Sequence, residues 1–446
     1  MLEEERCEIT ELQVSCRLRF VRVANTCLNP GISEILLSEA GTGMQNRLRM
    51  GIAVRHHLEP LLDSAYREIA TDTGLVLHLP FLRAAVHKHL KDLYQFISVF
   101  VGATGGMREL LQHHPARAGL IEGQAQAFLN NVRNSKNSQA NYKTISGRVE
   151  GIFGWMAANY NYNQVDATFP ALAPDDQEMA RGCGYLELGG QTMQMAFDYT
   201  APDNAALFRP VKIGNTTYNV VPYCWGDHGV NAAWNKHRGN LAAESPDNCL
   251  PSGVTVEVND GHPGSGDFVE CISECQKLMR PEVLGQPLAL APTNVKGWIG
   301  SANFYHGARA VLPGAPRPPP SDPITLILEA AKLHTGSPAQ YLARHASLLD
   351  GDKEYFFRAV FNAVYTSAIL HEGFGIKVAK AAEHDEIVGG AAEGPIRDFL
   401  NACVTDENVK TYRVIDPDTK PWAEGAALMY AHDPTQFGNL LGLNDN

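Results

Sequence analysis

The stretch of sequence that decides the fold is CGYLELGGQT, from Cys183 to Thr192. Its apolar first half predicts a β-strand that ends at a glutamate, and the glycine pair predicts a tight turn that lets the backbone approach a ligand closely. A second stretch, ISEILLSEAGTG from Ile32 to Gly43, repeats this order of strand, acidic residue and glycine turn. The similarity predicts a duplicated lobe.

Length and composition limit the class of protein. A chain of 446 residues is too long for one ordinary core, which favours two domains. Hydrophobic residues make up 44% and charged residues 19%, as is typical of a globular protein. No apolar run approaches the ~20 residues of a membrane-spanning helix. The net charge of −12, without a Lys/Arg cluster, argues against nucleic acid as a partner.

The first ten residues, MLEEERCEIT, lack the basic start and apolar core of a secretory signal. The sequence therefore predicts a cytoplasmic protein, with a removed signal, secretion or injection into a host as alternatives. Nine cysteines leave at least one thiol unpaired. Cys271 and Cys275 have a Cys-x3-Cys spacing, but no second pair with ligand spacing accompanies them. Packed or disulfide-bonded cysteines are therefore favoured over a structural zinc.

Three glycine turns are candidates for binding phosphate. One such turn alone is typical of ordinary chain reversal. Three turns that each carry a threonine, two of them preceded by a carboxylate, favour a shared site, because phosphoryl transfer depends on positioning and on donors around the phosphate oxygens. The turns are Gly41, Thr42 and Gly43; Thr104, Gly105 and Gly106; and Gly189 and Gly190 with Thr192.

Between the turns, apolar spacing predicts several helices. One covers Pro115 to Val132, and another is rich in aromatic residues and follows Glu150. A long helix is predicted from Tyr355 to Leu370, and a last one begins at about Ala423, where Pro421 is a start signal.

Five short motifs, in order, resemble those of the apyrase family of nucleoside triphosphate diphosphohydrolases. This resemblance implies an α/β protein of the actin/hexokinase (ribonuclease H-like) fold, with two lobes that each have a mixed sheet flanked by helices. The active site would lie in the cleft between the lobes. It also implies hydrolysis of terminal phosphates from nucleoside tri- or diphosphates. The motifs begin near Glu39 and continue as GATGGMR (Gly102–Arg108), EGIFGWMAANY (Glu150–Tyr160), ELGGQTMQMAF (Glu187–Phe197) and PWAEGAAL (Pro421–Leu428).

By position in these motifs, Glu150 would be the general base that deprotonates the attacking water. Thr192 and Gln194 would orient the same water, since a hydroxyl and an amide both donate and accept hydrogen bonds. The resemblance implies that the phosphate oxygens bind to Gly41, Thr42, Gly43, Thr104, Gly105, Gly189 and Gly190.

Glu39 and Glu187 would hold a divalent cation, Mg²⁺ or Ca²⁺, through its water shell. The family usually has aspartate at both positions, so the extra methylene puts metal preference and turnover in question. Tyr305 and Phe374 lie where the family places an aromatic sandwich for the nucleobase, and a buried core position is the alternative for both. Such a sandwich would accept many bases. The resemblance further implies a Cys249–Cys271 disulfide, which requires an oxidising compartment and conflicts with the cytoplasmic prediction.

The resemblance predicts an amino-terminal extension at 1–29 and a first lobe at 30–163 with a return segment at 412–446. The second lobe would be 164–411. A sugar kinase or a polyphosphatase on the same fold is one class of alternative. Another is a lapsed hydrolase that binds nucleotide or a protein partner without turnover. The sequence predicts no oligomeric state.

Overall fold

The computed structural model describes residues 99–132, 140–162, 183–199, 209–213, 216–242, 245–255, 262–279, 295, 297–312, 322–346, 356–379, 395–405, 411–414 and 421–442. The chain divides into two compact units. The first comprises Met1–Val101 and Gly119–Tyr142, and the second Gly102–Ala118 and Lys143–Asn446. No helix among the described residues is both long enough and apolar enough to cross a membrane.

Most of helix α5 (Pro115–Val132) lies in the first unit, and its bounds match the predicted helix. The buried side chains of Ile121, Ala125 and Leu129 recur every four residues, so they share one face. Strand β1 (Val99–Ala103) pairs with β2 (Ala140–Thr144). The side-chain oxygen of Gln126 accepts a hydrogen bond of 3.0 Å from the backbone N–H of Tyr142, which ties α5 to the start of β2.

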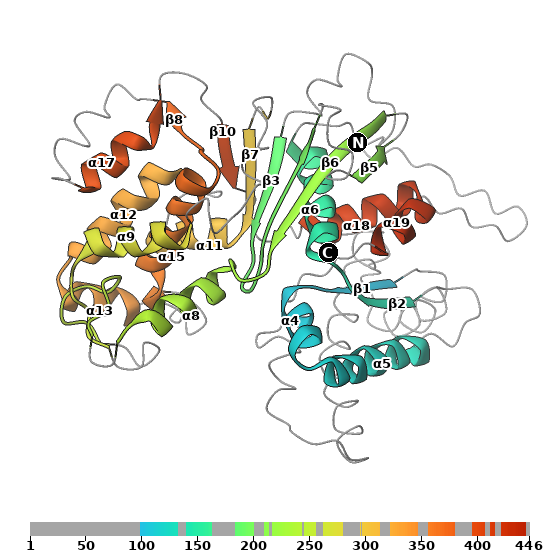
Figure 1. Ribbon diagram of the computed structural model, residues 1–446, viewed down its shortest axis with the longest axis horizontal. Coiled ribbons are helices and arrows are strands. Elements are labelled where there is room, and N and C mark those ends of the chain that lie inside the picture. The colour runs from blue at the N-terminus through green and yellow to red at the C-terminus, as the bar shows by residue number, and fades with distance from the viewer. Residues whose placement is uncertain are drawn as a thin grey trace, which may run out of the picture. The chain divides into compact units, whose positions relative to one another are not determined.

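A six-stranded mixed sheet forms the centre of the second unit, in the order β10-β7-β3-β4-β6-β5 (Figure 1). Strands β3, β4, β6 and β5 pair antiparallel, whereas β7 and β10 add in parallel on the other side of β3. This is the arrangement of a ribonuclease H-like lobe, and it confirms the predicted α/β class. The strands are β3 (Cys183–Leu188), β4 (Met193–Asp198), β5 (Arg209–Ile213), β6 (Thr216–Trp225), β7 (Gly297–Ala302) and β10 (Thr411–Val414).

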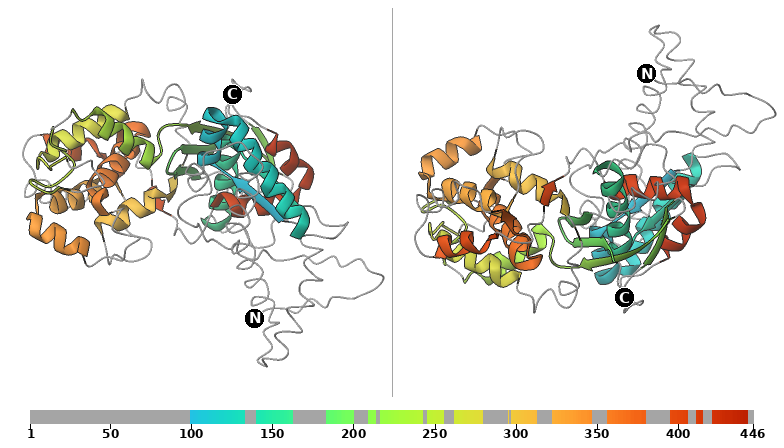
Figure 2. Two further views of the ribbon diagram at one scale, coloured as in Figure 1. Left: turned by 90° about the horizontal axis from the view of Figure 1, so that it is seen from below. Right: turned by 90° about the horizontal axis from the view of Figure 1, so that it is seen from above.

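Alternate residues of β3 face opposite sides of this sheet. Gly184 lies against the ring of Trp298 on one side, and Tyr185 lies against helix α6 (Gly147–Tyr162) on the other. A Cβ atom on Gly154 would come within 2.0 Å of the Tyr185 ring, so the glycine lets α6 approach the sheet closely. Helix α18 (Pro421–His432) packs beside α6, as Figures 1 and 2 show.

The opposite face of the sheet is covered by a helical layer. Its central helix, α15 (Ala359–Ala368), is buried at every position, as expected for a helix surrounded by other elements. On this face of the sheet, Trp298 of β7 packs against Phe197 of β4 and against Phe374, which follows η6 (Ile369–Gly373). The layer includes α9 (Phe268–Leu278), α11 (Asn303–Val311) and α12 (Pro323–Thr335).

The other elements are short. In chain order they are α4 (Gly105–His113), α8 (Val230–Asn240), α13 (Pro338–Ala346), the π-helix η6 (Ile369–Gly373), β8 (Val378–Ala379), α17 (Pro395–Ala402), β9 (Val404–Thr405) and α19 (Pro434–Leu441).

Candidate functional site

A row of polar side chains crosses the sheet on the face that packs against α6. In the strand register Glu187 is opposite Ser301 on one side and Gln194 on the other. Gln194 is in turn opposite Cys224. Directly paired residues have side chains on the same face of a sheet. Four strands therefore present one polar residue each beneath the same helix.

Glu150, in the first turn of α6, meets this row and is 4% exposed. The amide nitrogen Nε2 of Gln194 donates hydrogen bonds to Glu150 Oε2 at 3.1 Å and to Thr192 Oγ1 at 2.6 Å. Gln194 and Thr192 are also buried, at 1% and 7% exposure. The structure thus brings together all three residues that the sequence predicted to handle water.

Arg108 joins the same cluster, and sequence reasoning gave it no role. Its Nη2 atom donates to Glu150 Oε2 and to Thr192 Oγ1, both at 2.9 Å, while Nη1 donates to the backbone oxygen of Ile145 at 2.9 Å. Its position in GATGGMR could have indicated this role. Arg108 follows Thr104 by four residues, and residues four apart in a helix lie on the same face. A buried carboxylate without a partner charge would be destabilising, and the paired arginine compensates for this cost.

Glu187 is held by hydrogen bonds at the end of β3. The Tyr185 hydroxyl donates to Glu187 Oε2 at 2.8 Å, and Ser301 Oγ lies 2.7 Å from the same hydroxyl oxygen. Burial, followed by the nearby Glu187 charge, raises the pKa of Tyr185 well above its usual value, so the phenol keeps its proton as a donor. Glu187 itself is 8% exposed. The sequence did not indicate Tyr185, although it lies two residues before Glu187 and hence on the same side of the strand.

The glycine turn after β3 is bound from behind by the start of helix α8. The carbonyl oxygens of residues 189–191 accept hydrogen bonds from the N–H groups of residues 229–232. In a trans peptide the C=O and the following N–H point in opposite directions, so the N–H groups of residues 190–192 face away from α8. They have no acceptor in the described part of the chain. A Cβ atom on Gly229 would come within 2.4 Å of Gln191, so this contact requires glycine.

The turn before helix α4 lies next to this one. A Cβ atom on Gly105 would come within 3.1 Å of Thr192 Oγ1. The side chain of Thr104, the residue before α4, makes no capping hydrogen bond. The first N–H groups of a helix carry a partial positive charge and bind anions readily. Two of the three predicted phosphate turns therefore converge, each with backbone donors.

Other predicted site residues lie elsewhere. Glu39 and the turn Gly41, Thr42 and Gly43 fall outside the described residues. Tyr305 on α11 and Phe374 after η6 are 3% and 4% exposed and belong to the hydrophobic core. Phe374 packs edge-on against Trp225, so the described structure places these two rings with core side chains and not with Glu150.

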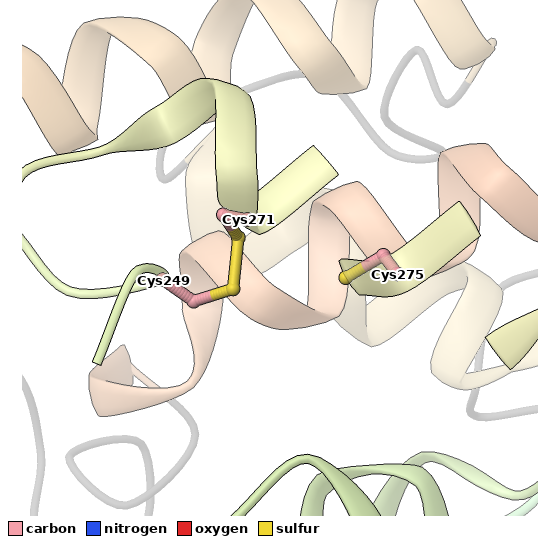
Figure 3. Close-up of side chains that lie close together, drawn as sticks. All are labelled: Cys249, Cys271 and Cys275. Carbon is pink, nitrogen blue, oxygen red and sulfur yellow. A yellow bond between two sulfur atoms is a disulfide. The ribbon is translucent and has the colours of Figure 1, made fainter. Parts of the chain in front are cut away.

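A disulfide joins Cys249 to Cys271, the pairing that the family resemblance implied (Figure 3). Both cysteines are buried. Disulfides persist in oxidising compartments such as the secretory pathway.

Comparison with known proteins identifies two curated proteins that are similar to most of this chain. The chain is 23% identical over 324 residues to the nucleoside-diphosphatase mig-23 of Caenorhabditis briggsae, with 63% of this chain and 57% of the relative covered. It is 22% identical over 382 residues to the Golgi apyrase of Schizosaccharomyces pombe, with 78% and 62% covered. The chain thus spans less than two thirds of the length of either relative.

A solved structure shares the fold. The crystal structure of nucleoside triphosphate hydrolases from Neospora caninum superposes with a TM-score of 0.51 at 13% identity, covering 92% of this chain and 85% of that one. This likeness confirms the predicted fold class.

The prediction of a cytoplasmic protein is wrong. A relative named for the Golgi points to the secretory pathway, where the Cys249–Cys271 bridge is also expected. An acidic start was a poor guide to location because it is read from ten residues, whereas the comparison extends over most of the chain. The family model of nucleoside phosphatases matches residues 53–286, more than half of the sequence. The chain therefore belongs to the GDA1/CD39 (nucleoside phosphatase) family.

Proposed function

We propose that this protein hydrolyses terminal phosphates of nucleoside tri- or diphosphates with the help of a divalent cation. The observation that carries the proposal is the buried Glu150 carboxylate, which shares hydrogen-bond partners with Thr192 beside two glycine turns. Family membership supports a nucleotide as substrate. A buried carboxylate among donors, next to backbone N–H groups, suits attack of water on a phosphoanhydride.

In this proposal Glu150 takes a proton from the attacking water. Gln194 and Thr192 orient that water, because each lies within hydrogen-bond distance of the other and Gln194 also reaches the carboxylate. Arg108 is a positioning residue that keeps Glu150 Oε2 and Thr192 Oγ1 in place. The proton moves to Glu150 as the oxygen bonds to phosphorus, and the bond to the leaving phosphate oxygen breaks.

The phosphate oxygens bind in this proposal to the N–H groups of residues 190–192 and to the uncapped start of α4. Successive N–H groups that face one way form a concave anion site. A protein with net charge −12 needs such local donors, because its overall field repels an anion. Thr104 and Gly105 add donors from the second turn.

Glu187 fits the cation. Its carboxylate is the hard oxygen ligand that Mg²⁺ and Ca²⁺ prefer, and Tyr185 fixes its orientation at the end of β3. Glu39 is the proposed second acidic residue. When bound, the cation supplies positive charge that offsets the charge developing on the phosphate oxygens.

Two further parts of the proposal rest on the family resemblance. Tyr305 and Phe374 remain predicted nucleobase residues, and binding there would require their rings to leave the core. The lobe boundaries, 30–163 with 412–446 and 164–411, also remain predictions. We place the protein in the secretory pathway, as the Golgi relative and the disulfide suggest.

A phosphate-release assay tests the proposal. The full chain is incubated with ATP, ADP, GTP, UDP and polyphosphate, each with Mg²⁺, Ca²⁺ or EDTA. We expect release from nucleotides with either cation and none with EDTA. Release from polyphosphate alone identifies a polyphosphatase, and nucleotide binding without release identifies a lapsed hydrolase; either result overturns the proposal.

A further inference from the structure

Three cysteine sulfurs gather in the helical layer, away from the residues of the proposed reaction. Cys271 and Cys275 lie one turn apart on the buried face of α9, and Cys249 reaches them from a preceding loop (Figure 3). All three side chains are at most 1% exposed. Their Sγ atoms lie within 4.8 Å of one another, although two of them form the disulfide. Cys249 is thus a third potential metal ligand beside the Cys-x3-Cys pair, and the spacing of that pair in the sequence did not indicate it.

A histidine and an acidic residue adjoin Cys249, one of the three cysteines. A ring nitrogen of His237 and a carboxylate oxygen of Asp247 lie within 4.8 Å of Cys249 Sγ. Asp247 Oδ1 lies 3.0 Å from His237 Nε2 and accepts the backbone N–H of Cys249 at 2.8 Å. The other ring nitrogen, Nδ1, lies 3.4 Å from Glu274 Oε2. Each ring nitrogen thus has a carboxylate beside it. The nitrogen that binds a metal must release its own carboxylate, while the other nitrogen keeps the carboxylate that orients the ring.

We propose that reduction of the Cys249–Cys271 bridge opens a binding site for a zinc-class metal ion. Its ligands are the thiolates of Cys249, Cys271 and Cys275 and the imidazole of His237. Three cysteines and one histidine form a common tetrahedral zinc set, and soft sulfur ligands exclude the hard cations that the proposed hydrolysis uses. The site is closed in the oxidised protein and open in the reduced one.

For the three sulfurs, the geometry requires little movement, and the His237 ring must approach them from its place beside Cys249. With Zn–S bonds of about 2.3 Å, tetrahedral coordination separates the sulfurs by about 3.8 Å. Cys275 Sγ is already within 4.8 Å of both bridge sulfurs. Once the bridge breaks, the other two sulfurs must move apart, because nonbonded sulfurs cannot remain at a covalent distance. That movement leads towards the spacing that the ion requires.

The chemistry balances with a dithiol as reductant. The dithiol gives two electrons and two protons to the S–S bond, becomes a cyclic disulfide itself, and leaves two thiols on the protein. The ion then displaces the protons of all three thiols, with no further change in oxidation state.

Cobalt binding tests the proposal in the full chain, since thiolate-bound Co²⁺ has a charge-transfer band that oxygen-bound Co²⁺ lacks. We expect one such site per chain in protein reduced without oxygen, displaced by Zn²⁺, and no band in the oxidised protein. Cys275→Ser should weaken binding about 100-fold, and His237→Gln at least tenfold, by analogy with losses on removing metal-site partners. Cys403→Ser, which removes a buried cysteine outside the cluster, should bind like the wild type.

Circular dichroism and mass spectrometry distinguish a loss of metal binding from a loss of folding or of the disulfide. Cys275→Ser retains both bridge cysteines, so its oxidised form should show the wild-type spectrum, the Cys249–Cys271 bridge and normal phosphate release. A reduced wild type that stays folded without the band, or that unfolds even with Zn²⁺ present, overturns the proposal. Equal binding by Cys275→Ser also overturns it. None of these results bears on the proposed hydrolysis, which is measured in the oxidised protein.

Discussion

Arg108 and Glu150 form an ion pair of 2.9 Å between Nη2 and Oε2, with side-chain exposures of 14% and 5%. The two residues come from different helices, α4 and α6. The same Nη2 atom reaches Thr192 after β3, so one guanidinium links three segments that are far apart in the chain. The catalytic carboxylate of the proposed reaction is therefore positioned from outside its own helix.

Glu150→Gln removes the proposed base and the charge that pairs with Arg108, while keeping the side-chain size and one oxygen that can accept from Arg108 and Gln194. We expect phosphate release to fall about 10²–10⁴-fold, the usual contribution of general base catalysis, with nucleotide affinity nearly unchanged. Steady-state kinetics and calorimetric titration measure the two effects. The exposed Glu109→Gln on α4 is the matched control and should keep full activity. Comparable activity in both variants would exclude Glu150 as the base.

Arg108→Lys keeps the charge but not the geometry. A lysine ammonium cannot reproduce the planar fork that reaches Ile145, Glu150 and Thr192 together. We expect kcat to fall at least about tenfold with KM little changed, because misplacement of a catalytic group slows the chemical step. Arg397→Lys, at an exposed position on α17, controls for the substitution type. A rise in KM alone would show that Arg108 binds substrate and does not position the base.

Tyr185→Phe removes the 2.8 Å hydrogen bond that orients Glu187. We expect the Mg²⁺ concentration for half-maximal phosphate release to rise about tenfold, while kcat at saturating Mg²⁺ changes less. Tyr341→Phe removes another buried hydroxyl, which donates to the backbone oxygen of Phe356. This variant controls for any loss of stability that follows from removing a buried hydroxyl. An unchanged Mg²⁺ requirement in Tyr185→Phe would mean that Glu187 does not depend on this hydrogen bond.

His228 lies in the loop that leads into α8, and its pKa is lowered from 6.5 to about 4, mainly by burial. Between these values the unfolded chain binds a proton that the folded chain does not, so stability falls as the pH decreases from 6.5 towards 4. We expect His228→Asn to reduce this pH dependence in urea titrations. The exposed His113→Asn should leave it unchanged. Identical slopes in wild type and His228→Asn would contradict the prediction.

Ala302 adopts φ 56°, a left-handed conformation that favours glycine, between β7 and α11. Ala302→Gly should relieve this strain and stabilise the protein by up to about 1 kcal/mol, although glycine normally destabilises folded chains. Thermal or chemical unfolding measures the difference. Ala308→Gly, inside α11, is the control and should be destabilising, as is usual for a helix interior. A less stable Ala302→Gly variant would show that the conformation carries no strain.

The local sequence predicted individual helices and strands better than it predicted which residues contact one another in the fold. The helix Pro115–Val132 and the strand at Cys183 follow from apolar spacing, which depends on neighbours a few residues away. Glu150, Thr192 and Gln194 were found because their motifs resemble those of a family. Arg108 and Tyr185 were missed, since their importance comes from contacts across sheet and helix that no local pattern records. Cys275 was likewise not predicted as a metal ligand, because Cys249 is distant in sequence and lies near it only in the folded chain.

The start of helix α8 engages every carbonyl of residues 189–191. On its far side the turn can therefore offer hydrogen-bond donors and no acceptors. In the proposed function, the preference of this turn for an anion over a cation therefore comes from the main chain and does not need a charged side chain.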